Sequence, residues 1–412
     1  MTRPGYDPGI TVVDEPGHSI KSHRPRVLMV WPLFPPSVRS GGPARTAEAI
    51  LTSLGAEFDF SVITSAYDFA SSKEMPEVRS DHWCEIFGAK VWYMSERRPP
   101  PFRLLQLIRS RDPQLVCLNS LWNARFSIFP LLTILASRME VPVLLSPHGE
   151  LSPGALRTRP WRKRFVICAY RALRINRRVS WHASTEMERA DIRRVFGPTV
   201  RCRVAVNLRS DLAPAQRLAR KTPEPLAPIR AVFLSRITPK KNLDGLLRAL
   251  SLVQTDIELT IAGPIDEPSH WSVCRQLIEA LPENAVARIH GPVAPAKVVD
   301  FLGGFDLFLL PTHGENFGHV ILEALAAGLP VIVGSDTPWQ QAEAEHAGWL
   351  VNSDSPPELA RLIDRFATLT PAERAVMSES ATRLAAKVLG RSEGVEAHRQ
   401  MFLELAQGER PR

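Results

Sequence analysis

The sequence predicts an α/β protein built from two doubly wound Rossmann-like domains that face each other across a cleft. At 412 residues the chain exceeds what one hydrophobic core usually serves, and two domains of about 150–200 residues are expected. Short apolar runs alternate with helix-forming stretches along the chain, which is typical of a mainly parallel sheet. The alternation stops at the polar, Pro-rich stretch Val206–Pro228 and then begins again.

These observations set the expected domain boundaries. The first residues are polar and rich in Pro and Gly, so we expect no packed structure there. The predicted organisation is a disordered tail over 1–24, a first domain over 25–210, a linker over 211–228, a second domain over 229–390 and a terminal helix over 391–412.

In the first domain each predicted strand is a short apolar run bounded by turn residues. The expected strands are 27–31, 58–65, 89–94, 115–122 and 141–149, with a short one at the start of 181–196. Helices are expected after Pro43, over 102–111 and over 157–178, where apolar residues recur at helical spacing. A further helix begins near Ser184 or Thr185, with Glu188 in its first turn.

The second domain repeats the same alternation. Strands are expected at 229–236, 257–264, 287–291, 305–311 and 329–334. Helices are expected at 242–253, 270–281, 294–304, 318–328, 355–369, 370–389 and about 393–407. Gly328 is a natural C-terminal cap, and Pro371 suits a first helical position after Thr370.

Composition favours a soluble globular protein of the cytoplasm. Hydrophobic residues make up 44% and charged residues 23% of the chain. The five cysteines are scattered and never in C-x-x-C spacing, which disfavours a disulfide framework and a structural zinc site. The first residues hold no apolar core like that of a signal peptide, and no apolar run approaches the ~20 residues of a spanning helix.

A basic balance favours anionic partners. The net charge is +8. Nine Arg or Lys and no acid lie in Arg157–Arg178, whose apolar residues recur at helical spacing. This predicts a basic amphipathic helix that contacts an anionic membrane surface through Trp161, Arg162, Lys163 and Arg164; the alternative is a core-packed helix with a solvated basic face. We expect no nucleic acid partner, because the chain has no recognition motif.

Two glutamates in "PTHGENFGHVILEALAAGLPVIVG" raise the question of a ligand. Glu315 follows the strand at 305–311, at the edge of a parallel sheet where ligands bind, and Glu323 lies in the next helix. Eight helical positions correspond to about 12 Å, which is the length of a sugar diphosphate and too long for two carboxylates acting on one bond. The alternative is an ordinary helix glutamate and an acid near a helix N-terminus.

The segment "SRITPKKN" predicts a diphosphate site. Ser235 and Arg236 end a strand, and Lys241 comes just before a helix. Backbone N–H groups and the helix dipole favour an anion there, while Arg adds a bidentate grip and Lys a point charge. The alternative is solvated surface charge.

The first domain offers weaker signals. The "SGGP" loop, Ser40–Pro43, would allow close backbone approach to a ligand through Gly41 and Gly42, although a plain tight turn also fits. His148, in "SPHGE", follows a strand on a Gly-bounded loop, as a site histidine would. The chain has no D-x-D and no metal-ligand spacing, so we expect neither a metal nor another cofactor.

"SRITPKKN" followed by "ENFGHVILEALAAGLPVI" resembles the second-domain signature of the retaining glycosyltransferases of family 4, including its E-x7-E pair. The resemblance runs from about Arg26 to the last helix and implies the GT-B fold, with the last helix crossing back onto the first domain. It implies metal-independent transfer of a hexosyl group from a nucleotide-diphosphate sugar to a hydroxyl of a glycan or lipid-linked acceptor, with retained configuration, in polysaccharide or glycoconjugate biosynthesis.

The resemblance also implies roles for single residues. Arg236 and Lys241 match the pair that neutralises the donor diphosphate, Glu323 matches the glutamate that binds the ribose hydroxyls, and Glu315 matches the one near the reacting carbon. His148 matches a histidine near the donor sugar. The further donor-site positions are Ser235, Gly41, Gly42, Asn316, Phe317 and Gly318.

The sequence departs from the family at three places. Ser235 stands where the family usually has Gly, "VNLRS" replaces "PNG", and a Trp common near the last crossing is missing. A nucleotide-sugar epimerase of the same fold and a catalytically silent nucleotide-sugar or lipid-binding scaffold remain alternatives. A glycosyl phosphorylase would need a pyridoxal-phosphate lysine site, which is not found. The basic helix adds the expectation of a cytoplasmic enzyme that is peripheral at the inner face of the membrane.

Overall fold

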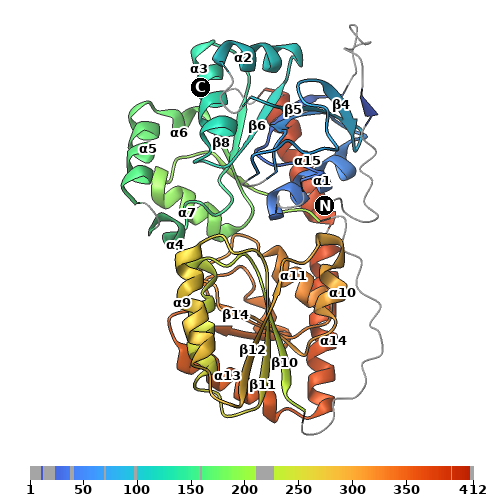
Figure 1. The fold of residues 1–412 in the computed structure, drawn as a ribbon. Helices are drawn as coiled ribbons and strands as arrows, with labels where there is room; N and C mark the ends of the chain where they lie inside the picture. The colour runs from blue at the N-terminus through green and yellow to red at the C-terminus, as the bar shows by residue number, and fades with distance from the viewer. Residues whose placement is uncertain are drawn as a thin grey trace. The chain divides into compact units, whose positions relative to one another are not determined.

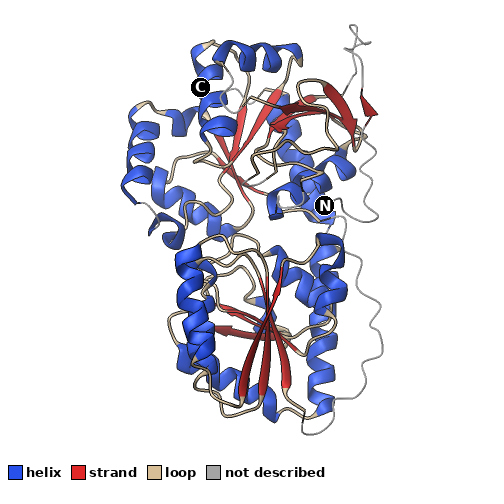
Figure 2. Cartoon of the chain, viewed as in Figure 1, coloured by secondary structure: helices blue, strands red, loops and turns tan. Residues whose placement is uncertain are grey.

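The computed structural model describes residues 11–12, 24–37, 41–68, 71–96, 100–157, 160–209, 227–390 and 392–408 (Figure 1). The chain divides into two compact units. The first unit comprises Met1–Asp211 with Ser392–Arg412, and the second comprises Leu212–Arg391. Each unit is an α/β domain around its own sheet (Figure 2).

The first unit is built on a nine-stranded sheet in the order β1-β4-β5-β3-β2-β6-β7-β8-β9. The strands are β1 Thr11–Val12, β2 Arg26–Val30, β3 Asp59–Ser65, β4 Trp83–Ile86, β5 Ala89–Met94, β6 Leu115–Asn119, β7 Val143–Ser146, β8 Ser180–Ala183 and β9 Cys202–Val204. All neighbouring pairs are parallel except β1 with β4 and β4 with β5. The strand order reverses between β2 and β6, which makes this the switch point of the sheet.

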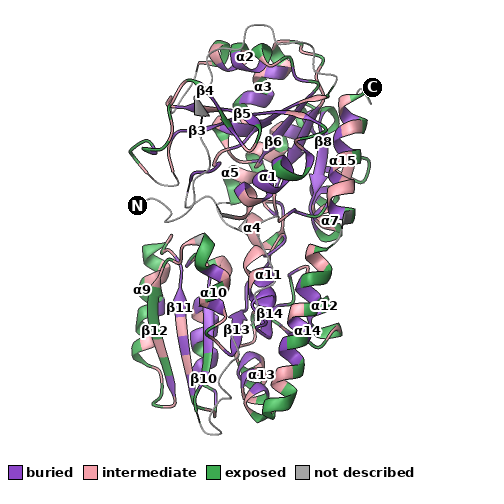
Figure 3. Cartoon of the chain, turned by 90° about the vertical axis from the view of Figure 1, so that its right-hand side faces the viewer, coloured by how far each residue is buried: buried purple, intermediate pink, exposed green. Residues whose placement is uncertain are grey.

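Helices cover both faces of this sheet. They are α1 Gly41–Leu54, α2 Pro101–Ser110, a π-helical turn η1 Ala124–Ile128, α3 Phe129–Ala136, α4 Pro153–Arg157, α5 Pro160–Ala172, α6 Ile175–Arg178 and α7 Glu186–Phe196. Alternate residues of β2 face opposite ways: Val27 and Met29 join one core cluster, and Leu28 and Val30 join the other. Burial on both faces explains the continuous apolar strands of the sequence (Figure 3).

The terminal helix α15, Ser392–Ala406, belongs to the first unit, as the predicted fold class requires. Its Met401, Phe402 and Leu405 join the core cluster that also holds α1 residues. The Phe402 ring lies edge-on to Phe58, with ring centroids 5.8 Å apart. The chain therefore returns from the second unit to complete the first core.

The second unit has a fully parallel six-stranded sheet in the order β12-β11-β10-β13-β14-β15. Its strands are β10 Ile229–Leu234, β11 Ile257–Ala262, β12 Ala285–Gly291, β13 Leu307–Leu310, β14 Val331–Gly334 and β15 Gly348–Val351. The chain adds strands in one direction as far as β12 and then resumes beside β10 with β13. The switch point of this sheet therefore lies between β10 and β13.

The second unit has a single core cluster, and its helices lie on both sides of the sheet (Figure 2). They are the 3-10 turns η2 Pro239–Lys241 and η3 Pro295–Lys297, and the α-helices α8 Leu243–Leu250, α9 Pro268–Glu279, α10 Val298–Leu302, α11 His319–Ala326, α12 Gln341–Ala344, α13 Pro356–Thr368 and α14 Pro371–Leu389. Thr370 and Glu373 form a capping box ahead of α14, with Pro371 at the first helical position as predicted.

The structure differs from the sequence prediction in the N-terminal tail and in the basic helix. Thr11–Val12 pair with β4 although a disordered tail was expected over 1–24; the tail otherwise lies outside the described residues except for Arg24. The predicted helix over 157–178 is divided into α5 and α6, because Arg174 adopts a left-handed conformation (φ 53°). The linker predicted over 211–228 lies outside the described residues up to 226.

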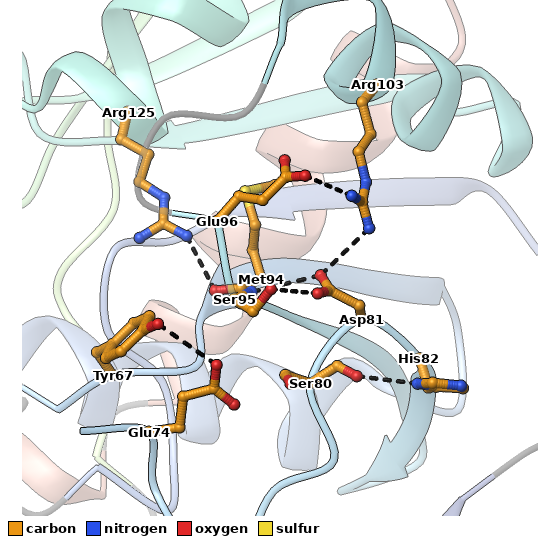
Figure 4. A network of polar contacts seen from close by, with 10 residues as sticks. All are labelled: Tyr67, Glu74, Ser80, Asp81, His82, Met94, Ser95, Glu96, Arg103 and Arg125. Carbon is orange, nitrogen blue, oxygen red and sulfur yellow. Dashed lines mark hydrogen bonds and ion pairs between the residues drawn. The ribbon is translucent and has the colours of Figure 1, made fainter.

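A polar network fixes the carboxyl end of β5 (Figure 4). Asp81 accepts hydrogen bonds from the backbone N–H of Ser95 (3.3 Å) and from its hydroxyl, and Arg103 of α2 lies 3.5 Å from the same carboxylate. Arg125 donates to the carbonyl of Met94 at 2.9 Å. Two helical segments are thus tied to one strand end.

Within the described residues, no helix is both long and apolar enough to cross a membrane.

Candidate active site

The predicted diphosphate residues lie at the switch point of the second sheet. Lys241 ends η2, in the connection that follows β10, and Glu315 lies in the connection that follows β13. Because β10 and β13 are parallel neighbours, their carboxyl ends lie at the same edge. Two residues that are far apart in sequence are therefore brought together where an α/β sheet offers a ligand crevice.

Lys241 and Glu315 form an ion pair that is largely withdrawn from solvent. Lys241 Nζ donates to Glu315 Oε1, and the two side chains are 13% and 11% exposed. Burial raises the pKa of the Glu315 carboxyl, but the charges of Lys241 and Lys240 and hydrogen bonds from Lys241 and Thr312 outweigh it, so the pKa lies below its usual value. Glu315 is therefore ionised at neutral pH.

Asn242 holds the two loops together. It is buried in a left-handed conformation (φ 58°), and its side-chain amide donates to the carbonyls of Pro311 (2.9 Å) and Ser353 (2.7 Å). The carbonyl of Lys240 accepts from the backbone of His313 at 2.9 Å and from the hydroxyl of Thr312 at 3.0 Å. The position of the ion pair is thus set by backbone as well as by charge.

Arg236 has a different partner from Lys241. Its guanidinium donates to Asp266 at 3.0 Å and is 58% exposed. Gly263 lets the β11 end approach this loop closely, since a Cβ there would lie 1.9 Å from the carbonyl oxygen of Ser235. Asp266 was not singled out in the sequence, because nothing in "GPIDEP" marks one acid among several.

The start of α11 presents unused backbone donors. Gly318 caps the helix with φ 75°, and the N–H groups of Asn316, Phe317 and Gly318 make no hydrogen bond within the described part of the chain. The Asn316 Oδ1 atom is also buried without a hydrogen-bond partner there. Trp339 fixes this loop by donating to the carbonyl of Phe317 at 2.6 Å. The arrangement suits an anion or a group of hydroxyls.

Glu323 is half-buried in α11. The helix begins only at His319, so the chain between Glu315 and Glu323 is partly irregular. The helical estimate of about 12 Å therefore does not describe this pair.

The carboxyl edge of the first sheet gathers a second group of residues around its switch point. His148 follows β7 in a left-handed conformation (φ 49°), and its Nε2 lies 2.6 Å from Nδ2 of Asn119 at the end of β6. The ring of Trp31, after β2, lies edge-on to His148 with centroids 6.1 Å apart. Trp31 Nε1 donates to the carbonyl of Pro43 at 3.2 Å, which connects this group to the start of α1.

Gly41 and Gly42 are the first two residues of α1, rather than part of a loop as predicted; Ser40 lies outside the described residues. Helix formation reaches them because Pro43, which follows, suits the first turn of a helix. Their backbone N–H groups stand at a helix N-terminus, which keeps an anion-binding role chemically reasonable.

Three histidines lie in a row beneath this edge. The ring centroids of His148 and His182 are 6.4 Å apart, and those of His182 and His398 of α15 are 5.3 Å apart. Burial, with the charges of its two neighbours, lowers the pKa of His148 to about 3. Burial also lowers the pKa of His182, and it lowers that of His398 to about 3. All three rings are therefore neutral near pH 7, and His148 can offer a lone pair or one N–H but no positive charge.

Two carboxylates position the His148 loop, the buried Glu188 and the partly buried Glu150, and neither was predicted as a site residue. Glu188 accepts from the backbone N–H of Gly149 (2.6 Å) and of Ser184 (2.7 Å). Glu150 accepts from the hydroxyl of Ser120 at 2.7 Å and from the backbone of Leu121. Each acid bridges loops that follow neighbouring strands, and only the E in "SPHGE" could have pointed to one of them.

The basic stretch is only partly free for a surface. Trp161 and Phe165 of α5 are 68% and 75% exposed, and the Arg162 guanidinium lies 4.9 Å from the Trp161 ring centroid. Lys163 instead donates to the carbonyl of Ala155 at 2.5 Å, and Arg164 is exposed.

The described residues contain no group of His, Cys, Asp or Glu that could hold a metal ion.

Both halves of the chain match family models of glycosyltransferases. Residues 41–207 match the Glycosyl transferase 4-like domain, and residues 215–384 match the Glycosyl transferases group 1 domain. The chain thus carries a glycosyl transferase 4-like domain followed by a glycosyl transferases group 1 domain.

Solved structures share the fold over nearly the whole chain. Sucrose-phosphate synthase from Thermosynechococcus elongatus matches with a TM-score of 0.70 and 15% identity, over 93% of this chain and 99% of that one. Anabaena HepE in complex with UDP and glucose matches with a TM-score of 0.67 and 16% identity, over 93% and 100%. WaaG, a glycosyltransferase involved in lipopolysaccharide biosynthesis, has a TM-score of 0.62 and 14% identity, over 93% and 100%. The fold is GT-B, with two Rossmann-like units.

Curated relatives match over a shorter stretch. The D-inositol 3-phosphate glycosyltransferase of Streptosporangium roseum is 30% identical over 168 residues, 38% of this chain and 38% of its own length. That of Rhodococcus jostii is 34% identical over 131 residues, 30% of this chain and 29% of its own. The chain therefore spans about a third of the length of these relatives.

The Glu188 contacts predict a specific loss of stability. Glu188→Ala leaves the buried N–H groups of Gly149 and Ser184 without an acceptor and should lower the free energy of unfolding by about 3 kcal/mol. Denaturant unfolding measures this change, with Glu186→Ala as the control because Glu186 is an exposed acid of the same helical turn. Equal stability of the two variants would contradict the bridging role.

Glu150 predicts a pH dependence. Burial, opposed by hydrogen bonds from Leu121 and Ser120, raises its pKa to about 6, above the 4.5 of an exposed carboxyl. The folded state then holds a proton that the unfolded state has lost, so stability falls by about 2 kcal/mol as the pH rises from about 4.5 to 6. The difference in unfolding free energy between wild type and Glu150→Gln should show this fall; a difference independent of pH would contradict it.

Proposed function

We propose that the protein is a retaining, metal-independent glycosyltransferase that moves a hexosyl group from a nucleotide-diphosphate sugar to an acceptor hydroxyl. One observation carries the proposal. Lys241 and Glu315 form a shielded ion pair at the switch point of the second sheet, within the segment that matches the Glycosyl transferases group 1 domain. We propose that the enzyme needs no cofactor, because fixed cations and backbone N–H donors would stabilise the diphosphate in place of a metal ion.

Donor binding would exchange one ion pair for several contacts. The diphosphate would draw Lys241 away from Glu315 and occupy the N–H groups before α11. Glu315, released, could then accept hydrogen bonds from hydroxyls of the sugar, while Glu323 accepts from the ribose. Arg236 would reach the phosphates by leaving Asp266, which an exposed guanidinium can do at small cost.

The chemical step would be mainly electrostatic. As the bond to the leaving phosphate breaks, negative charge grows on the diphosphate and positive charge on the sugar ring. Lys241, Arg236 and the helix N-terminus stabilise the first more strongly in the transition state than in the ground state, which is what accelerates a reaction. Neutral His148 would hydrogen-bond sugar or acceptor hydroxyls without adding a positive charge near the developing cation.

The partners proposed are a nucleotide-sugar donor and a glycan or lipid-linked acceptor. HepE was solved with UDP and glucose, so UDP-glucose is the first donor to test. The partial relatives are named for D-inositol 3-phosphate, which makes phosphorylated polyols reasonable acceptors to include. We also propose a cytoplasmic location, peripheral at the inner face of the membrane, for synthesis of a polysaccharide or glycoconjugate.

A catalytically silent nucleotide-sugar or lipid-binding scaffold, or a nucleotide-sugar epimerase, is the competing function. A thermal-shift screen against nucleoside diphosphates and their sugars identifies the donor, since a ligand of the folded state raises its stability. Release of nucleotide from that donor then distinguishes transfer or hydrolysis from mere binding. Stabilisation by a donor without nucleotide release would favour the scaffold, and a changed sugar on intact nucleotide would favour the epimerase.

Lys241 and Glu323 should each matter to donor use. Lys241→Ala and Glu323→Ala are expected to weaken donor binding or turnover at least tenfold, or about 1.4 kcal/mol, because each removes a proposed contact to one end of the donor. Initial rates at several donor concentrations provide the measurement. Lys297→Ala and Glu279→Ala are matched controls, as both residues are exposed in the second unit. Wild-type rates in both test variants would remove these residues from the site.

The basic helix should affect membrane binding and not donor use. Changing Arg162, Lys163 and Arg164 to Gln is expected to reduce sedimentation with phosphatidylglycerol vesicles, since each basic residue near an anionic surface contributes about 1 kcal/mol. Donor hydrolysis should stay unchanged. Vesicle binding that persists in the triple variant would refute the membrane contact.

A further inference from the structure

A basic cavity lies in the first unit where three helices end. Its volume is about 380 Å³, near the lower end of the roughly 300–1,000 Å³ typical of small-molecule sites. Figure 1 shows α5, α6 and α7 together on one side of this unit. The side chains lining the cavity are Arg171, Arg174, Asn176, Arg177, Arg194 and Phe196.

The cavity shares no lining residue with the group around His148, and the topology places it toward the other edge of the sheet. Helix α7 begins after the carboxyl end of β8 and must run back before β9, because β8 and β9 are parallel. Its last residue, Phe196, is therefore near the amino edge of the sheet, whereas His148 follows the carboxyl end of β7. A ligand in the cavity would not be the one that reacts at the candidate active site.

The four guanidinium groups are poorly matched by acids. Arg194 pairs with Asp191 at 2.9 Å. Arg171, Arg174 and Arg177 form no ion pair within the part of the chain that the structure describes. The four side chains are solvent-exposed, so water and salt screen their mutual repulsion, but their summed positive charge still favours an anion between them.

Helix capping accounts for only part of this set. Arg171 donates to the carbonyl of Val195 and Asn176 to that of Phe196 (3.3 Å), both at the end of α7. Arg194 donates to Leu151 at 2.9 Å. The side chains of Arg174 and Arg177 have no such acceptor within the described residues. Both side chains are exposed, so their guanidinium groups are available to an external anion.

The walls of the cavity are well fixed. The Phe196 ring stacks on Trp181, with centroids 4.7 Å apart, and Trp181 is fully buried. Asn176 is 7% exposed. The cavity therefore combines residues anchored in the core with exposed guanidinium groups, which suit bidentate recognition of phosphate oxygens.

We propose that this cavity binds a phosphate or diphosphate group, separately from the sugar donor. The ligand is either a free phosphate compound or the phosphate end of a lipid. Leu173, next to Arg174, is 58% exposed and could meet a hydrocarbon chain. The site goes beyond the proposed transferase reaction, and its test does not depend on that activity.

The experiment measures binding of inorganic pyrophosphate to the full chain by calorimetry at fixed ionic strength. All chains carry Lys241→Ala, so that the candidate donor site contributes little. Arg174→Gln with Arg177→Gln should weaken binding at least tenfold. The matched control is Arg178→Gln with Arg193→Gln, which removes the same charge from exposed arginines that do not line the cavity and should change binding less than twofold.

An equal loss in both pairs, or no loss in either, would overturn the proposal, because the first result reflects net charge alone and the second needs no site. Thermal unfolding of each chain verifies that the variants fold. Farnesyl diphosphate is the second probe: affinity at least tenfold above that of pyrophosphate assigns the site to lipid-borne phosphate, and equal affinity assigns it to a free phosphate compound. Donor turnover is measured separately with Lys241 intact, so failure of the transferase proposal leaves this result standing.

Discussion

The ion pair between Lys241 and Glu315 is the constraint on which the second unit's site depends. Neither charge would be stable alone at this depth, since removing one partner of a buried pair typically costs about 3–5 kcal/mol. The pair therefore holds the loops after β10 and β13 in register, with Asn242 as the backbone clamp. A ligand that separates the pair must supply an anion for Lys241 and hydrogen-bond donors for Glu315. The site therefore suits a molecule with an anionic part and a hydroxyl-bearing part.

In the first unit, carboxylates that accept hydrogen bonds from loop backbone hold the loops in place. Glu188 and Glu150 accept backbone N–H groups, so they hold the loops after β6, β7 and β8 without offering charge to the surface. His398 of α15 lies against His182, which in turn lies beside His148. The return of the chain to this unit thus contributes to the surroundings of the candidate site as well as to the core.

The strand and helix order could be predicted because buried parallel strands are continuous apolar runs and the helices are rich in helix formers. Lys241 and Glu315 could be placed at one sheet edge for the same reason. Their pairing could not, because it depends on the left-handed turn at Asn242, and Arg236's partner Asp266 is one acid among several. The break at Arg174 was missed because its amphipathic spacing continues through a left-handed residue.

The two cationic groups of residues differ in whether a ligand must break ion pairs in order to bind. At the switch point of the second sheet, Lys241 and Arg236 already have carboxylate partners. A diphosphate that replaces these partners gains little binding free energy unless hydroxyls of the same ligand hydrogen-bond to the released carboxylates. Such a site gains selectivity at the expense of affinity. In the arginine-lined cavity, Arg174 and Arg177 form no ion pair within the described residues. An anion would therefore bind there without breaking an ion pair, and its charge alone would favour binding. The proposed donor site would thus select its substrate, whereas the proposed phosphate site would hold a phosphate whose remaining structure matters less.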